Sequence, residues 1–246
     1  PVSSILPLLE PMAKALPAMW LRASDVKSLP VTSGHDDNWD LSGTDGRENL
    51  FRTAVVLLLT AIVRKLGPHA VCNPSMRELL LRVIEYGTDV SGSNTGGIFM
   101  LEEACELWDN VICAADVYSA DLSNLYPRVH EILGHDFDNL KVMFRILEGY
   151  ALLGGRQFMQ QYGESVSQLL NNALRNLKDR GCLATCEVID LILQLFPRDG
   201  PILFANVLQR SLHLAASGRE SRNLSSAYVY LVLRAVLSNI ECVETE

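Results

Sequence analysis

The sequence predicts an all-α protein, a solenoid of about five stacked helical hairpins. Apolar residues recur at spacings of three and four through most of the chain, and no convincing strand alternation interrupts them. The predicted helix starts fall into two sets, one near residues 74, 119, 157 and 200 and the other near 98, 138, 183 and 225. Each set recurs at roughly 40 residues, which is the period of HEAT or armadillo units. A compact helical bundle is the alternative fold.

The first third of the chain contains three predicted helices and a long loop. Residues 2–22 form the first helix, with Pro7, Pro11 and Pro17 expected to kink it. Residues 24–48 are rich in Gly, Ser, Asp and Pro and predict a flexible surface loop. A strongly apolar helix then runs from Leu50 to Leu66 and ends at Gly67-Pro68. Asn73-Pro74 supplies an N-cap and a first-turn proline for the next helix, to about Tyr86.

A second flexible loop is predicted over residues 87–97, and everything after it is helical. The expected helices span residues 98–114, 119–133, 138–153, 157–178, 183–196, 201–217 and 225–240. The helix over 138–153 has Asp138 as its expected N-cap and Gly154-Gly155 as its end. It is apolar over most of its circumference, which is typical of a helix packed between neighbours. The whole chain, 1–246, is therefore predicted to be a single repeat array.

Composition limits the kind of partner. The chain has 246 residues, 48% of them hydrophobic, and a formal net charge of -8. That charge argues against nucleic acid and anionic membranes as partners and favours basic proteins. The longest apolar run, Ala54 to Val63, is too short to cross a bilayer, which takes about 20 residues. Since the chain opens without an initiator Met or a signal sequence, we expect it to be a fragment of a longer protein.

The candidate interaction residues lie on exposed polar stripes of the second set of helices. In a stacked array these stripes would lie side by side on one wall, and the helix over 98–114 would carry its most concentrated negative charge. A plainly solvated face is the alternative interpretation. The candidate residues are Glu102, Glu103, Glu106, Asp109, Lys141, Arg145, Glu148, Glu187, Asp190 and Gln194.

No catalytic or metal-binding pattern is present in the sequence. G-x-x-x-x-G-K-[ST], H-E-x-x-H and G-x-S-x-G are all missing. Cys182 and Cys186 lie one helical turn apart, but a metal site would need two more ligands such as His213, and no second close pair exists. We therefore predict no enzyme, no cofactor and no metal.

Three stretches of the chain have a more specific pattern than helical periodicity alone. They are MLEEACELWDNVI at Met100–Ile112, NLKVMFRILEGYALLGGRQFMQQYGESV at Asn139–Val166, and the segment Glu187–Leu208 at the same spacing. These stretches resemble the C-terminal HEAT repeats of the importin-11 family of β-karyopherins. The resemblance implies a nuclear transport receptor that shuttles between nucleus and cytoplasm and binds cargo proteins. It also implies that Ran-GTP acts through N-terminal repeats outside this fragment.

In such receptors the inner helices of the hairpins line the concave wall, and here these would be the second set. The ten candidate residues would then face cargo, with basic cargo fitting the acidic stripe. We expect a monomer that binds neither nucleic acid nor membrane. A helical-repeat scaffold unrelated to nuclear transport is the alternative function.

Overall fold

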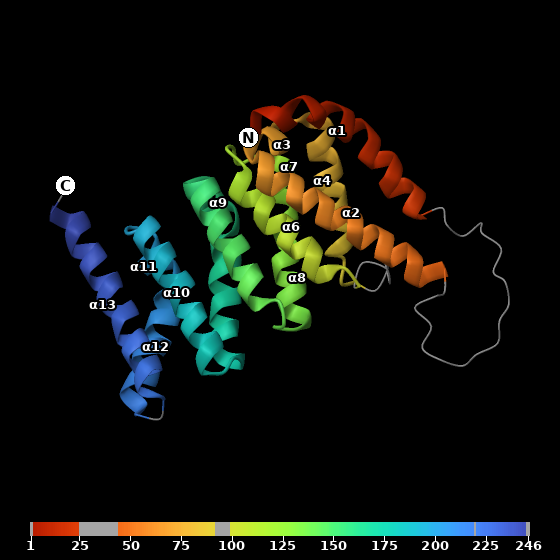
Figure 1. Ribbon diagram of the computed structural model, residues 1–246. Coiled ribbons are helices and arrows are strands. Elements are labelled where there is room, and N and C mark those ends of the chain that lie inside the picture. The colour runs from red at the N-terminus through yellow and green to blue at the C-terminus, as the bar shows by residue number, and fades with distance from the viewer. Residues whose placement is uncertain (1, 25–43, 92–98, 219, 245–246) are drawn as a thin grey trace, which may run out of the picture. The chain divides into compact units, whose positions relative to one another are not determined.

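The computed structural model describes residues 2–24, 44–91, 99–218 and 220–244 (Figure 1). Within these ranges all regular secondary structure is helical, and helices pack on their sequence neighbours as in a repeat solenoid, which confirms the predicted fold class. The chain forms two compact units, Pro1–Met143 and Phe144–Glu246. Among the described helices, none combines the length and the apolar character that crossing a bilayer requires.

Unit 1 stacks its helices in the manner of a repeat. Helix α2 packs on α6 and α1 packs on α4, while α1 and α2 form a hairpin, as do α4 and α6. Each hairpin thereby covers the apolar face that its neighbour cannot bury alone. The helices are α1 (Val2–Ser24), α2 (Thr44–Leu66), α3 (Pro68–Cys72), α4 (Pro74–Gly87), α6 (Leu101–Ala114), α7 (Ala120–Leu125) and α8 (Pro127–His135).

Unit 2 contains most of α9 (Leu140–Asn176), followed by α10 (Asp179–Leu195), α11 (Gly200–Leu203), α12 (Ala205–Ser217) and α13 (Arg222–Glu244). The backbone of α9 leaves the helical region at Gly155, where φ is 51° and ψ is -131°, so α9 is two helices joined at a kink. Glycine adopts this positive φ without steric cost, and the predicted helix end is confirmed. Tyr150 and Phe158 stack across the kink with ring centroids 5.7 Å apart.

Polar contacts between corresponding helices recur at a nearly constant sequence spacing. Arg64 on α2 contacts Glu106 on α6, 42 residues later. Arg77 on α4 contacts Asp121 on α7, 44 residues later, and Asp190 on α10 contacts Arg234 on α13 at the same spacing. These separations match the repeat length of roughly 40 to 47 residues that HEAT units have.

Both predicted loops are shorter than the sequence suggested. Ser24 ends α1, residues 44–48 belong to α2, and Gly87 ends α4, so these parts of the predicted loops 24–48 and 87–97 are helical. The first turns of α2 are stabilised by an ion pair between Glu48 and Arg52, one turn apart and almost completely buried. Residues 25–43 and 92–98 lie outside the described part of the chain, so their flexibility stays a prediction.

Two predicted helix boundaries were wrong in detail. Asp138 is not the N-cap of α9, because the helix begins at Leu140. Asp136 instead caps the turn, since its carboxylate accepts a hydrogen bond from the Asp138 backbone N–H at 3.0 Å. The helix expected over 119–133 is broken into α7 and α8 at Tyr126-Pro127, because proline has no N–H to continue the helical hydrogen bonds.

The contact between α4 and α7 predicts a loss of stability in acid. Asp121 accepts hydrogen bonds from Arg77 Nε at 2.6 Å and Nη2 at 2.8 Å, and the bound guanidinium lowers the pKa of the Asp121 carboxyl well below its usual range. An aspartate in the unfolded chain titrates near about 3.9. This contribution to stability is therefore complete above that pH and is lost as the pH falls towards the lower pKa of the folded state.

We expect Asp121→Asn to lower the free energy of unfolding at pH 7 by about 1 kcal/mol, since the pair is partly solvated. The difference from the unaltered chain should shrink as the pH falls from about 5 to about 2. Urea unfolding at several pH values measures it. Glu131→Gln, which removes a wider 3.7 Å pair with Arg128, is the control and should show little change. A difference that stays constant across this range would contradict the assignment.

Candidate protein-interaction surface

The acidic stripe lies on the solvent-facing side of helix α6, because the apolar residues on the other side of the helix are buried in the core. Six side chains on the core face are buried, Ala104, Cys105, Leu107, Trp108, Val111 and Ile112. Glu102 and Glu106 consequently point to solvent, while Glu103 and Asp109 are half-buried at its edges. Glu102 and Glu103 also lie in the first turn, where the positive end of the helix dipole favours carboxylates.

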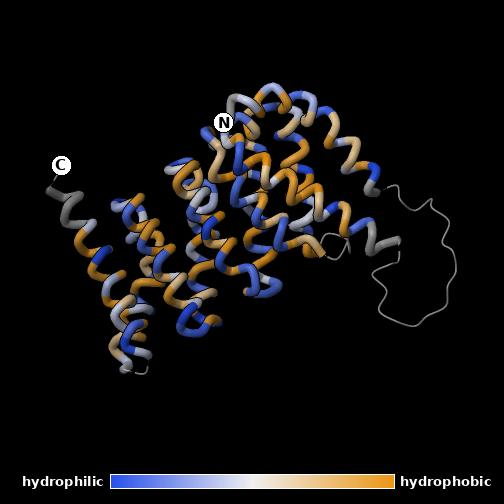
Figure 2. Tube along the Cα trace, in the orientation of Figure 1, coloured by the Kyte–Doolittle hydropathy of each residue, from blue (hydrophilic) through white to orange (hydrophobic). Residues whose placement is uncertain are grey.

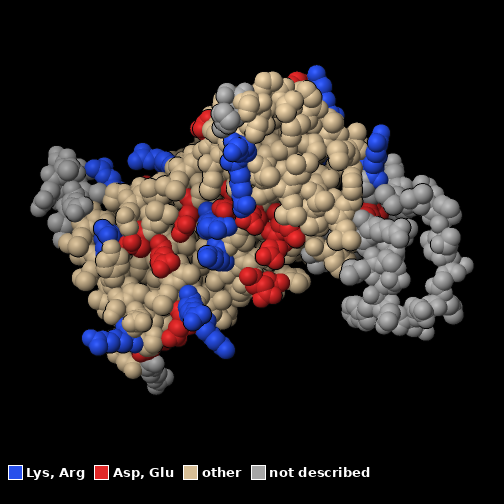
Figure 3. Space-filling view, in the orientation of Figure 1, with Lys and Arg blue, Asp and Glu red and all other residues tan. Residues whose placement is uncertain are grey.

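The start of α6 and the turn before α9 form one acidic hollow of about 440 Å³ in unit 1. Its lining consists of Phe99, Leu101, Glu102, Glu103, Asp136, Asp138 and Asn139. Figure 3 shows acidic side chains gathered on this region. A hydrogen bond from the His135 ring at 3.1 Å lowers the pKa of the Asp136 carboxyl, with the Asp138 N–H adding to the effect. The Asp136 carboxylate therefore keeps its charge to a lower pH than an ordinary aspartate does.

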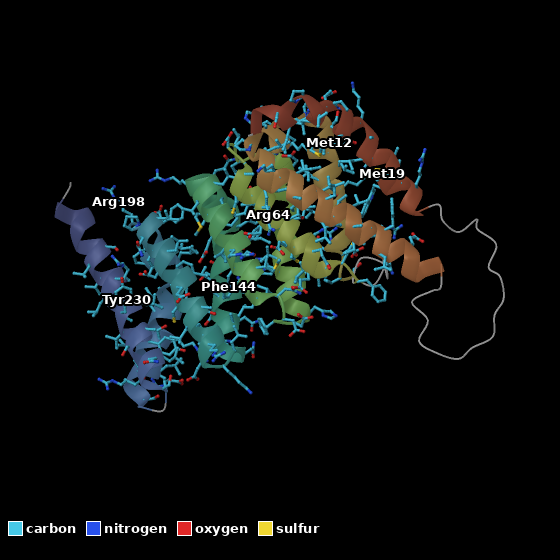
Figure 4. All side chains as sticks on the ribbon, in the orientation of Figure 1. Met12, Met19, Arg64, Phe144, Arg198 and Tyr230 are labelled. Carbon is cyan, nitrogen blue, oxygen red and sulfur yellow. The ribbon has the colours of Figure 1, made fainter. Side chains whose placement is uncertain are left out.

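The structure adds two acidic residues to the predicted acidic stripe and shows one basic residue in contact with it. Asp136 and Asp138 join Glu102 and Glu103 because the turn before α9 returns beside the start of α6. Arg64, labelled in Figure 4, donates to Glu106 and, at 3.0 Å, to Asn110, so part of the negative charge of α6 is already neutralised from α2. The repeat period of roughly 40 residues was the only signal that could have pointed to Arg64.

The other candidate residues are distributed over both units. Lys141, in unit 1, and Arg145, in unit 2, are exposed, and Glu148 is half-buried. On α10, Glu187 and Gln194 are exposed, whereas Asp190 is half-buried and accepts hydrogen bonds from Arg234 at 3.1 Å and from Gln194 at 2.7 Å. The acids of α6 thus belong to unit 1 and the polar residues of α10 to unit 2. A single wall through all ten residues stays a prediction.

Of the five cysteines whose side chains the structure describes, Cys105, Cys182 and Cys186 are buried in the core, and Cys72 and Cys113 are exposed. Burial raises the pKa of the Cys105 and Cys186 thiols to about 12, so neither forms a thiolate at neutral pH. No group of three or more His, Cys, Asp or Glu side chains within the described ranges is arranged to hold a metal ion. The described residues thus form a helical-repeat module.

Comparison with known proteins assigns this module to a family. A family model described as "Importin-11-like, TPR repeats" matches residues 53–243, and the chain belongs to that family. Mouse and human importin-11 are each 25% identical to it over 191 residues, which cover 78% of this chain and 19% of the relative. The importin beta-like protein kap113 of Schizosaccharomyces pombe is 22% identical over 200 residues, covering 80% and 20% of the two chains. No solved structure gave a significant match.

Family membership confirms the resemblance seen in the sequence and the prediction that the chain is not an enzyme, since importin-family proteins are non-catalytic transport receptors. The chain spans about a fifth of the length of these relatives. The family description names TPR repeats, which usually recur at about 34 residues. The contacts between corresponding helices recur instead at 42 and 44 residues, so the repeats of this chain have HEAT-like length.

Proposed function

We propose that this chain is a segment of a nuclear transport receptor that binds cargo proteins and shuttles between nucleus and cytoplasm. The match to the importin-11-like family over residues 53–243 supports the class. Ran-GTP would release cargo through repeats outside this segment. The segment itself would act as a monomeric cargo-binding wall without catalysis.

The acidic surface on α6 is the observation that points to the kind of cargo. Glu102 and Glu106 are exposed, and Glu103, Asp136 and Asp138 line the adjacent hollow. Clustered carboxylates attract positively charged proteins over long range and accelerate their association, and salt weakens this attraction. Basic cargo proteins therefore suit this surface best.

Reversing the charge of Glu102 and Glu103 together should weaken capture of basic nuclear proteins by about tenfold at low salt, and by less as salt screens the surface. The protein as the cell expresses it is immobilised, and capture from nuclear extract is quantified with and without Ran-GTP. Glu106 is left intact, because its reversal would also break the contact with Arg64.

The control reverses Glu78 on α4 and Glu131 on α8, two exposed acids that lie outside the α6 surface. This variant has the same net charge as the first and should retain its cargo. Equal capture by both variants at low salt would show that the α6 acids do not bind cargo, and capture indifferent to Ran-GTP would argue against a transport receptor.

A further inference from the structure

Helix α2 has an exposed apolar stripe with a specific spacing. Leu50, Ala54, Leu57, Ala61 and Arg64 follow one another at alternating intervals of four and three residues, and all five are exposed. Leu50 is 62% exposed and Leu57 is 55% exposed. Because an α-helix turns by about 100° per residue, these five positions lie along one side of α2. We call this side the α2 seam.

The α2 seam is separate from the face by which α2 joins the core. Val56, Leu59 and Val63 are at most 2% exposed and lie on the opposite side of the helix. Figure 2 shows hydrophobic residues along most of α2. A helix that is apolar on two sides is normally covered on both, and the core of unit 1 accounts for only one of them.

The spacing and the residue types of the seam are those of a coiled-coil contact. Alternation of four and three residues keeps one line of side chains facing a partner helix along several turns. The large side chains of Leu50 and Leu57 can act as knobs, and the small Ala54 and Ala61 leave the space into which a partner's side chains insert. The surface is thus shaped for a helix rather than for an extended peptide.

The acidic stripe of α6 runs along one edge of the seam. Figure 1 shows α2 and α6 side by side and running in the same direction, and the two helices pack on each other. Arg64, the last residue of the seam, reaches across to Glu106 and Asn110. Glu102, one turn before Glu106 on the same side of α6, and Glu103 therefore flank the seam. Charges beside a coiled-coil seam select the charge of the partner.

We propose that the α2 seam binds an amphipathic helix of a partner protein, with apolar side chains against Leu50 and Leu57 and Lys or Arg on the flank facing α6. The inference deepens the proposed function, on which it rests, by naming the structural class of the cargo segment. An acidic helix, or a second copy presenting the same acidic edge, would place like charges beside Glu102 and Glu103.

The test uses two synthetic helical peptides of three heptads with the same Leu seam, one carrying Lys and the other Glu on one flank. Fluorescence anisotropy measures their binding to the 246-residue chain. We expect the Lys peptide to bind at least about tenfold more tightly than the Glu peptide. Leu57→Glu should weaken binding of the Lys peptide by at least about tenfold, because it places a charge in the centre of the contact.

Leu58→Glu is the matched control, since Leu58 is 41% exposed and lies about 100° around the helix from Leu57. It should weaken binding clearly less than Leu57→Glu does, because position 58 lies at the edge of the contact and not in its centre. Both residues are exposed, so neither substitution disturbs the core, and circular dichroism verifies the fold.

Four results would overturn the proposal: no binding of the Lys peptide, equal affinity for both peptides, equal effects of the two substitutions, or a dimer of the chain that Leu57→Glu dissociates. A competing segment of the chain itself is tested with Leu57→Cys. If replacing residues 25–43 makes a thiol reagent label this cysteine faster, that segment covers the seam in the unaltered chain, and the proposal is overturned.

Peptide binding without Ran-sensitive cargo capture would leave the proposed α2 seam intact and reject the transport function. If reversal of Glu102 and Glu103 abolishes cargo capture but Leu57→Glu does not, the transport function stands and the α2 seam is rejected as the cargo site.

Discussion

Replacing Arg52 with Ala should lower the free energy of unfolding of unit 1 by about 3–5 kcal/mol, because it leaves a buried carboxylate without its partner. The side chains of Arg52 and Glu48 are only 8% and 11% exposed and form an ion pair within α2. Arg52 also donates to the Tyr86 hydroxyl and lies over the rings of Tyr86 and Trp20, at 4.8 and 5.9 Å. One side chain thus connects α1, α2 and α4.

Urea unfolding followed by circular dichroism measures the loss, and Arg82→Ala is the control. Arg82 pairs with Glu78 at the same i, i+4 spacing, but the two side chains are 50% and 71% exposed. An exposed pair of this kind contributes about 0.5 kcal/mol or less. If Arg52→Ala lowers the free energy of unfolding no more than Arg82→Ala does, the Glu48 carboxylate must become solvated when Arg52 is removed. The contacts of Arg52 would then not be what holds α2 against α1 and α4.

The sequence predicted the helices well because their evidence is local. Asn73-Pro74 marked the start of α4, and the Asn73 side chain accepts a hydrogen bond from the Met76 N–H at 3.0 Å as an N-cap should. Gly155 marked the kink of α9 because few other residues adopt its backbone angles. Glu48 was assigned to a loop although its ion-pair partner Arg52 lies one turn along the same helix. The local sequence does not show that this pair is buried, because the rings that cover Arg52, those of Trp20 and Tyr86, come from other helices.

The candidate surface was predicted only in part, for the same reason. Spacing within α6 identified Glu102 and Glu106 as exposed, since a single helix defines its own faces. The approach of Asp136 to Glu103 and of Arg64 to Glu106 depends on how separate helices stack. The seam on α2 was hidden in a strongly apolar stretch, because the sequence does not show which of two apolar sides a neighbour covers.

A second large effect is expected at the close contact between α4 and α6, where Gly87 meets Ala104. A Cβ atom at position 87 would lie 2.5 Å from the Ala104 Cβ and 3.4 Å from the Met100 Cγ. The Ala104 side chain has no rotamer with which to move aside, so the two helices would have to separate. We expect Gly87→Ala to destabilise unit 1 by about 1–3 kcal/mol, as overpacking in a core does. Gly134→Ala on α8, where nothing lies within 4 Å, is the control and should be neutral.

The double variant Gly87→Ala with Ala104→Gly distinguishes a steric clash from any other effect of the substitution. Exchanging the two residues removes the overlap of Cβ atoms, although glycine within α6 costs about 1 kcal/mol of helix stability by itself. We therefore expect the double variant to be more stable than the sum of the single changes predicts, with a coupling energy of about 1 kcal/mol or more. Since α6 carries Glu102 and Glu103 beside the α2 seam, Gly87→Ala should also weaken binding of the Lys peptide, and the exchange should restore it. If the stability change of the double variant equals the sum of the changes in the two single variants, the close approach of α4 and α6 does not depend on the missing side chain at Gly87.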